Sequence, residues 1–219
     1  MKLLAVSDVE SALLYSPLIV ERFSDVDLIL SCGDLPYYYI EYMISMLNVP
    51  CYFVRGNHAS TREYGVAGMR KFPWGAVDLH RKCKEDDTGL LLAGLEGSLR
   101  YNMGPYQYTQ SQYWEMVLSL VPRFLLNKLN LGRYLDVFIA HAPPWQVHDD
   151  TDLPHRGIKA FRWLINVFQP AYFLHGHIHV YRRETVTRSI IDKTTVQNVF
   201  GYKTLTVPTP EVRSWQKKR

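Results

Sequence analysis

The sequence predicts a single domain of the α/β or α+β class, built around a mixed β-sheet. Three observations predict it. Short apolar runs recur along the chain, segments of helical character lie between them, and the last third is rich in threonine and valine. A length of 219 residues suits one domain with a sizeable core. No linker of Gly, Ser or Pro and no internal repeat divides the sequence, so we treat 1–219 as one domain.

The apolar runs predict strands. They do not alternate with polar residues, which is typical of strands covered on both faces. The predicted strands are Leu3–Val6, Val26–Leu30, Cys51–Val54, Leu90–Leu95, Val137–Ala140 and Ala171–Leu174. The segment Tyr181–Val207 predicts antiparallel strands from its threonine and valine content.

Three segments between these strands predict helices. Tyr37–Leu47 follows Pro36, which suits a first helical position. Tyr113–Leu131 is helical in character, and we expect it to break near Pro122. Gly157–Phe168 carries apolar residues at helical spacing and stops shortly before a proline. Strand–helix alternation with a strand-rich end therefore underlies the predicted class.

Composition narrows the function classes. Hydrophobic residues make up 47% and charged residues 21%, which argues against disorder. No apolar run is long enough to span a membrane, and the N-terminus turns acidic too early for a signal peptide. The 3 cysteines are too few for a disulfide framework, so we expect reduced thiols and a cytoplasmic protein. The net charge of +4 permits a nucleic-acid partner but does not require one.

Polar residues cluster where the predicted strands end. Five of the apolar runs lead directly into Asp, Glu, Asn or His. In open α/β sheets, ligands bind beyond the carboxyl ends of the strands, so these coincidences predict one shared site. The segments are Ser7-Asp8-Val9-Glu10, Gly33-Asp34, Gly56-Asn57-His58, His141-Ala142 and Gly176-His177-Ile178-His179.

Each signal alone has an ordinary interpretation. An Asp after a strand usually forms a turn or a helix N-cap, and Gly56-Asn57 is a common turn dipeptide. His177 and His179 face the same side of an extended segment, which suits one metal site or two adjacent ones. The combined carboxylates, imidazoles and amide suit divalent Mn, Fe, Co, Ni or Zn. These donor groups are too many for one tetrahedral ion, so the sequence predicts two ions. Two adjacent metal ions promote displacement reactions at phosphorus.

The ordered motifs resemble those of the calcineurin-like metallophosphoesterases, and they extend from Asp8 to His179. The resemblance implies a four-layer αββα sandwich, in which two mixed β-sheets pack face to face with helices outside. It also implies an enzyme, a metal-dependent phosphoric ester hydrolase. A dinuclear metal centre with a bridging hydroxide would hydrolyse a small phosphodiester or phosphomonoester.

The resemblance also implies roles for individual residues. Asp34 would bridge the two metals, and His58 would stabilise the phosphate charge or protonate the leaving oxygen. The implied ligands are Asp8, Glu10, Asp34 and His179 for the first metal, and Asp34, Asn57, His141 and His177 for the second.

Two positions depart from the family pattern. Glu10 stands where the family usually has histidine; it either binds metal directly, favouring harder ions such as Mn²⁺, or acts from outside the ligand set. Ala59 replaces the acid that usually orients the histidine, so His58 is less well oriented or pairs with Glu10 or Glu63. These departures motivate an alternative, a catalytically weakened metal-binding or protein-interaction scaffold on the same fold.

Four further residues are candidates for substrate contact. Arg100 and Tyr101 follow the strand Leu90–Leu95, whereas His155 and Arg156 lie on the loop after His141. Loops near a site mouth carry specificity, and an arginine can hold a phosphate through two hydrogen bonds. An ordinary turn is the competing interpretation of the first pair. The oligomeric state is not predicted.

The remaining histidines and a run of tyrosines have plainer interpretations. We expect His175 to pack at a strand end and His80 to lie on the surface, whereas His148, on the loop after His141, is a further candidate for the rim of the site. The tyrosines 37–39 point to different faces of a helix, so at least one is expected in the core.

Overall fold

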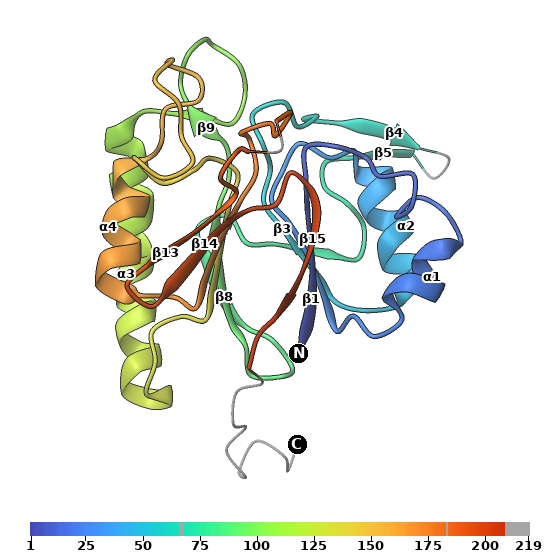
Figure 1. The fold of residues 1–219 in the computed structure, drawn as a ribbon, viewed down its shortest axis with the longest axis horizontal. Helices are drawn as coiled ribbons and strands as arrows, with labels where there is room; N and C mark the ends of the chain where they lie inside the picture. Colours follow the sequence, from blue (N-terminus) through green and yellow to red (C-terminus); the bar gives the residue numbers. More distant parts are fainter. Residues whose placement is uncertain (66–67, 183, 209–219) are drawn as a thin grey trace.

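The computed structural model describes residues 1–65, 68–182 and 184–208. In this part of the chain, two large sheets face each other, with helices α1 and α2 outside one and α3 and α4 outside the other (Figure 1). The layers run helix, sheet, sheet, helix, which confirms the mixed class and the sandwich. The helices are α1 Leu18–Phe23, α2 Tyr37–Leu47, α3 Gln110–Leu131 and α4 Lys159–Phe168.

The first sheet has the strand order β15-β1-β2-β3-β6. Strands β1, β2, β3 and β6 are parallel, and β15 pairs with β1 antiparallel at the edge. Because β1 to β3 are parallel, their carboxyl ends meet at one edge of the sheet. The strands are β1 Lys2–Ser7, β2 Leu28–Ser31, β3 Cys51–Phe53, β6 Ala76–Asp78 and β15 Gly201–Thr206.

The second sheet has the order β13-β14-β12-β11-β8-β7. Its four central strands are parallel, with Val137 of β11 opposite Tyr172 of β12, and both edge strands are antiparallel. The strands are β7 Lys82–Glu85, β8 Leu91–Leu95, β11 Val137–Ala140, β12 Tyr172–His175, β13 Arg188–Ile191 and β14 Thr194–Asn198. Two small ribbons, β4 Glu63–Gly65 with β5 Gly68–Arg70 and β9 Ser98–Leu99 with β10 Gln107–Tyr108, lie beside the sheets.

Apolar side chains fill the spaces between the layers. Leu3 and Leu30 of the first sheet pack with Val137 and Leu174 of the second, and all four are fully buried. Burying a side chain of this size stabilises the fold by about 1.5–3 kcal/mol. Separate clusters lie under α1 and α2 and under α3 and α4. This packing holds the carboxyl ends of both sets of parallel strands against each other.

Several element predictions are confirmed, and several are wrong. The predicted break at Pro122 does not occur: α3 is continuous, because Leu120 and Phe124 are buried in the packed face and a Thr109 capping box anchors the start. Pro36 is the N-cap of α2 rather than its first residue. Helix α1 and ribbon β4–β5 were not predicted because they are short and their apolar pattern is weak.

The strand-rich end is only partly antiparallel. Strand β13 pairs antiparallel with β14, as predicted, but β14 pairs parallel with β12, and β15 joins the other sheet. Pairing partners far apart in sequence decide this, and local composition does not encode them. None of the described helices is both long and apolar enough to cross a membrane. Cys32, Cys51 and Cys83 are free thiols.

Tertiary packing also decides the environments of the tyrosines and of His80. Tyr37 and Tyr39 are buried and Tyr38 is exposed, so the expectation of a core tyrosine is confirmed. The surface position predicted for His80 is wrong. Its side chain is 20% exposed, and its Nδ1 accepts a hydrogen bond from the backbone N–H of Glu96 at 3.2 Å.

Candidate metal centre

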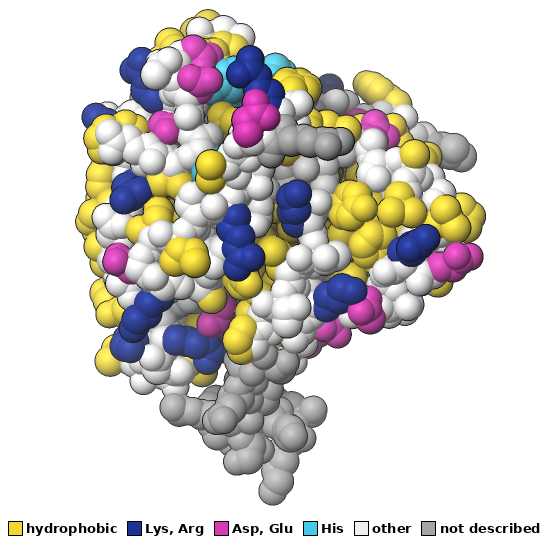
Figure 2. Space-filling view, viewed as in Figure 1, with side chains coloured by type: hydrophobic (Ala, Val, Ile, Leu, Met, Phe, Trp, Pro, Cys, Tyr) yellow, Lys and Arg dark blue, Asp and Glu magenta, His cyan; other side chains and the backbone are white. Residues whose placement is uncertain are grey.

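Three side chains from both sheets converge at the carboxyl ends of the strands. Asp34 follows β2, His141 follows β11 and His177 follows β12, and their donor atoms all lie within 4.8 Å of one another. Histidine side chains reach the molecular surface at this end of the molecule (Figure 2). The face-to-face packing of the sheets brings together residues that are far apart in sequence.

His141 is the fully buried centre of this group. Its Nδ1 lies 2.9 Å from the Cys32 carbonyl oxygen, and its Nε2 lies 3.1 Å from both Asp34 Oδ2 and Asn57 Oδ1. Burial alone would lower the pKa of His141, but the Asp34 carboxylate raises it to about 9. With Nδ1–H donated to the carbonyl, Nε2 faces two oxygen acceptors, an arrangement that a bound cation satisfies as well as a proton does.

His177 is held in the neutral form. Burial lowers the pKa of His177 to about 3. Its Nε2 lies 2.9 Å from the Pro154 carbonyl oxygen, and its Nδ1 lies 3.2 Å from His141 Nε2. Donation of Nε2–H to that carbonyl leaves the Nδ1 lone pair pointing into the group, which is the form that binds metal.

The carboxylates of Asp8 and Asp34 add negative charge at the same edge. Burial would raise the pKa of Asp34, but His141 and the backbone N–H of His58, which donates to Oδ1 at 2.8 Å, lower it to about 2. Burial raises the pKa of Asp8, whose side chain is 1% exposed and accepts from the backbone N–H of His177 at 3.1 Å. Within the described residues no Lys or Arg pairs with either carboxylate, so the protonated His141 ring or a bound metal ion is the cation that offsets their charge.

The backbone at these positions adopts conformations that few residues take. Asp8, Asp34 and His177 have φ values of 67°, 54° and 66°, in the left-handed region. A Cβ on Gly56 would collide with the Asp34 carboxylate, and one on Gly176 would collide with Ser7 and Asp8. Gly56 and Gly176 are therefore required by close approach, and strained backbone positions concentrate at functional sites.

The residues predicted for the first metal are less tightly gathered. His179 is 45% exposed, with Nε2 3.9 Å from Asp8 Oδ1 and Nδ1 2.7 Å from the Tyr181 hydroxyl. Glu10 is exposed, and its Oε2 accepts a hydrogen bond from the Tyr38 hydroxyl at 2.6 Å. Glu10 is thus outside the compact group.

A small cavity of about 130 Å³ lies beside Ala59 and the exposed His58. Glu63 lines it, but both carboxylate oxygens accept from the backbone N–H of Tyr37, at 2.9 and 3.0 Å. Among the described residues, neither Glu63 nor Glu10 forms an ion pair with the His58 ring. The pairing suggested as a substitute for the missing acid is therefore not present.

The four substrate candidates divide into two pairs. The Tyr101 hydroxyl accepts from Asn57 Nδ2 at 3.2 Å, and the His155 ring lies 5.1 Å from the His177 ring. Arg100 instead donates to Gln107 and Gln112, and Arg156 donates to the Thr151 carbonyl at 3.3 Å. Tyr101 and His155 are at the centre, whereas both guanidinium groups have other partners.

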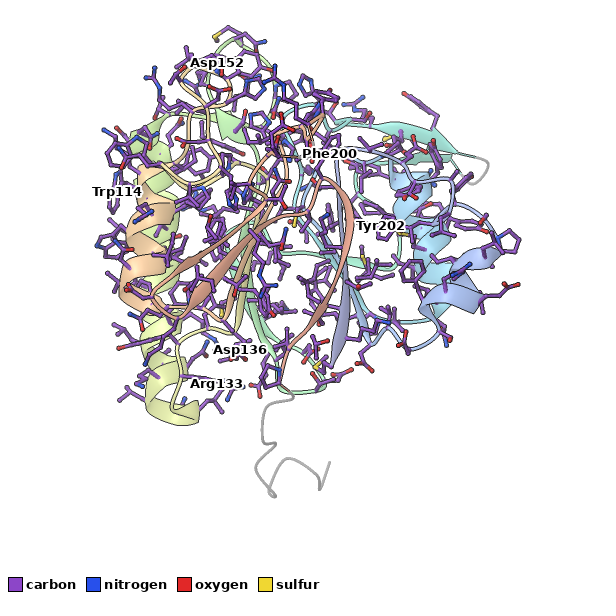
Figure 3. The ribbon with its side chains drawn as sticks, in the orientation of Figure 1. Trp114, Arg133, Asp136, Asp152, Phe200 and Tyr202 are labelled. Atoms are coloured by element: carbon purple, nitrogen blue, oxygen red, sulfur yellow. The ribbon has the colours of Figure 1, made fainter. Side chains whose placement is uncertain are left out.

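Several contacts at the centre had no assignable signal in the sequence. The carbonyls of Cys32 and Pro154 orient two histidines, and any residue has a carbonyl. Phe200, which lies 4.9 Å ring to ring from His179, comes from the strand-rich end (Figure 3). The contact of Tyr38 with Glu10 was within reach of sequence reasoning, because three tyrosines follow Gly33-Asp34 so closely.

His175 packs at a strand end, as expected from the sequence. It is fully buried, and its Nε2 lies 3.0 Å from His148 Nδ1, while His148 Nε2 lies 2.9 Å from Ser189 Oγ. Burial lowers the pKa of His175 to about 3 and that of His148 to about 4. These neutral histidines form a polar layer next to the Gly176–His177 loop.

Comparisons with known proteins agree with this geometry. A crystal structure with 16% identity superposes with a TM-score of 0.60 and covers 93% of this chain and 94% of that one. The crystal structure of TT1561 from Thermus thermophilus has 15% identity and a TM-score of 0.57, over 91% of this chain and 89% of that one. At such identities the likeness concerns the fold alone. No curated protein shows significant similarity to the chain.

The family itself is identified from the sequence. A model of the calcineurin-like phosphoesterases matches residues 1–181, which include every strand end that contributes to the centre. Members of this family bind divalent metals and hydrolyse phosphate esters. The resemblance in the motifs is therefore confirmed, and the chain belongs to the calcineurin-like phosphoesterase family.

Proposed function

We propose that the protein hydrolyses a small phosphate ester, a phosphodiester or a phosphomonoester, with two divalent ions held at the carboxyl ends of the strands. One observation carries the proposal: the donor atoms of Asp34, His141 and His177 lie within 4.8 Å of one another. Asn57 Oδ1 lies 3.1 Å from His141 Nε2 and adds an amide oxygen to the same point.

The donor set fits divalent metals. Asp34, Asn57, His141 and His177 would hold one ion, and Asp8, Asp34 and His179 the other, with Glu10 or solvent completing it. Mixed oxygen and nitrogen donors suit Mn²⁺ first, with Fe, Zn, Ni or Co as alternatives. When bound, two such ions activate water and neutralise charge at phosphorus.

The chain's own groups supply binding and proton transfer. The ring of His58 is exposed, its backbone N–H donates to Asp34 Oδ1, and the ring is proposed to protonate the leaving oxygen. Tyr101 and His155 would contact the substrate, since both lie against ligands of the same ion. A polymer such as nucleic acid is not required, and free thiols suit the expected cytoplasmic location.

Two observations favour the scaffold alternative. No acid stands at Ala59, and Glu10 is hydrogen-bonded to Tyr38 rather than gathered with Asp34. A scaffold of this kind would bind metal but would hydrolyse no phosphate ester.

One assay distinguishes the enzyme from the scaffold. It measures hydrolysis of bis-p-nitrophenyl phosphate and of p-nitrophenyl phosphate by protein loaded with Mn²⁺. We expect turnover, with Asp34→Asn reducing kcat/KM by at least about 10³-fold and His58→Ala by about 10²-fold. The matched control is Asp25→Asn, an exposed aspartate paired with Lys2, which should match wild type. Bound metal without turnover of either ester, with each of the divalent ions in turn, would establish the scaffold instead.

A further inference from the structure

A chain of hydrogen bonds runs from edge strand β13 to the backbone beside the proposed ligand His177. Ser189 Oγ lies 2.9 Å from His148 Nε2, and His148 Nδ1 lies 3.0 Å from His175 Nε2. His175 Nδ1 lies 2.9 Å from the carbonyl oxygen of Gly176. His175 is fully buried and His148 is half-buried, and neither belongs to the proposed ligands or substrate contacts.

This chain of hydrogen bonds has one direction. A carbonyl oxygen only accepts hydrogen bonds, so His175 Nδ1 carries the proton and donates it to the Gly176 carbonyl. Burial lowers the pKa of both histidines, so both rings are neutral and each carries a single N–H. His175 Nε2 therefore accepts from His148 Nδ1–H, and His148 Nε2 accepts from the Ser189 hydroxyl. Every nitrogen of the two rings has one defined role.

The end of the chain orients one peptide unit of the proposed metal centre. The carbonyl of Gly176 and the N–H of His177 belong to the same planar trans peptide, so the two groups point in opposite directions. Holding the carbonyl toward His175 therefore aims the N–H at the Asp8 carboxylate, whose oxygens lie 3.1 Å from it. The φ of His177 is 66°, a left-handed conformation that persists only where surrounding contacts impose it. The bond from His175 is one of those contacts.

The His148 end of the chain also attaches the loop that contacts the His177 ring. This loop connects β11 to α4, and its Pro154 carbonyl oxygen lies 2.9 Å from His177 Nε2. The backbone N–H of Gly157 donates to the Asp149 carboxylate at 2.9 Å and closes the part of the loop that carries Pro154, next to His148. His177 is therefore restrained at its backbone by the preceding carbonyl and at its ring by the loop.

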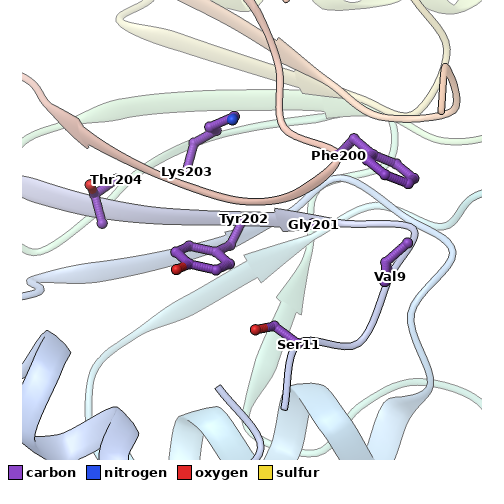
Figure 4. Close-up of a pocket in the computed structure, with 7 residues that line it drawn as sticks. All are labelled: Val9, Ser11, Phe200, Gly201, Tyr202, Lys203 and Thr204. Carbon is purple, nitrogen blue, oxygen red and sulfur yellow. The ribbon is translucent and has the colours of Figure 1, made fainter. Parts of the chain in front are cut away.

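The other end of this segment has a simpler anchor. Asn198 is 1% exposed, and its Nδ2 donates to the Ile178 carbonyl at 2.8 Å. Beyond it, Phe200 lies at one end of the surface hollow along β15 (Figure 4), with its ring 4.9 Å from the ring of His179. His179 nevertheless stays 45% exposed. The two-histidine chain thus acts on the buried ligand His177, and not on His179.

We propose that His148 and His175 are positioning residues of the metal centre. Through the backbone beside His177 and the loop over its ring, they set the orientations of Asp8 and His177 before metal arrives, which raises the affinity for a divalent ion. The inference rests on the proposed function, because it requires that Asp8 and His177 bind metal.

Calorimetric titration of the metal-free protein with MnCl₂ tests this role. His148→Leu removes both hydrogen bonds of the ring, whereas His148→Asn keeps a side-chain N–H that can donate to His175. We expect Mn²⁺ to bind about tenfold more weakly to His148→Leu and within about threefold of wild type to His148→Asn. The matched control is Asn127→Leu, which should leave the affinity unchanged. Asn127 is 3% exposed and donates to the Tyr134 carbonyl at 3.1 Å, beside the start of β11 at the opposite end of the sheet.

Hydrogen exchange gives a readout that needs no metal. The measured quantity is the exchange rate of the His177 amide divided by that of the Leu30 amide in the core of the first sheet, so that global destabilisation cancels. His148→Leu should raise this ratio about tenfold in the metal-free protein, and Asn127→Leu should leave it unchanged.

The outcomes separate this inference from the proposed function. If phosphate esters are hydrolysed but His148→Leu binds Mn²⁺ as Asn127→Leu does, the positioning role is overturned and the function stands, even where the exchange ratio changes. Equal losses of affinity in His148→Asn and His148→Leu would also overturn it, because the donated hydrogen bond would then not matter. If the affinity depends on His148 as expected but no ester is hydrolysed, the function fails and the positioning role stands. A wild type that binds no Mn²⁺ overturns both.

Discussion

The two halves of the proposed metal centre differ in how firmly the fold holds their side chains. Asn57, His141 and His177 are buried, and each ring nitrogen of the two histidines has a partner within 3.2 Å. Glu10 and His179 are exposed, and both are hydrogen-bonded to tyrosine hydroxyls. We call these the buried half and the exposed half of the centre.

The difference follows from how far the packed sheets enclose each side chain. His141 comes directly after β11, and its ring enters the space between the sheets, where packing leaves one orientation. Glu10 and His179 lie in loops open to solvent. Donors whose orientation is set before binding cost less conformational entropy when metal arrives. The buried half should therefore bind metal more tightly.

Replacing one histidine from each half is expected to give the largest effect, a change in Mn²⁺ affinity that differs between the two halves. His141→Gln should weaken the tighter Mn²⁺ site by at least about 100-fold, whereas His179→Gln should weaken the other by less than about tenfold. Calorimetric titration with Mn²⁺ measures both, and melting of the metal-free proteins checks folding. Equal losses in the two variants would show that burial does not order the two sites.

Glu10→His sharpens the description of the exposed half. Imidazole suits Zn²⁺ better than a carboxylate does, so the variant should bind Zn²⁺ at the weaker site about tenfold more tightly and Mn²⁺ less tightly. Tyr38→Phe, which removes only the hydrogen bond to Glu10, is the companion variant, and we expect a change in affinity of less than about tenfold. The idea fails if Glu10→His leaves the Zn²⁺ to Mn²⁺ preference as it was.

The smallest expected effect is on the pH dependence of stability. It comes from His148, which forms a polar layer with His175 next to the buried half. The folded-state pKa of His148 is about 4, below the ordinary value of about 6.5, so the unfolded chain takes up the proton first as the pH falls. Its contribution to stability is therefore present above about pH 6.5 and is lost as the pH falls toward about 4. His148→Gln should flatten this part of the pH dependence of the melting temperature of the metal-free protein. An unchanged slope would mean that other groups govern it.

Much of the fold could be predicted from local pattern. Val137–Ala140 and Tyr37–Leu47 have the predicted bounds, since an unbroken apolar run and a helical segment after proline are local signals. Pro122 shows the limit. A proline inside a helix costs about 3 kcal/mol or more, and only burial of residues such as Phe124 against distant strands outweighs that cost.

The residues of the candidate site likewise divide into those that the local sequence predicts and those that it does not. Asp34, His141 and His177 could be named because each follows a buried strand, and the fold brings them together. Arg100 and Arg156 donate to backbone carbonyls instead of pointing into the site. The spacing of residues in the sequence does not encode which acceptors such long side chains reach. Phe200 carried no signal, because only the chain's passage from β14 in one sheet to β15 in the other brings its ring to His179.

The sequence by itself determined the buried strands, the order of polar residues at their ends and the family. Those properties depend on neighbours a few residues apart, which hydrophobic periodicity and turn chemistry record. Only the tertiary structure decided which of those polar residues meet. The distance between His141 and Asp34 is set by the packing of one sheet on the other, and the orientation of Glu10 by its hydrogen bond to Tyr38 on a different element.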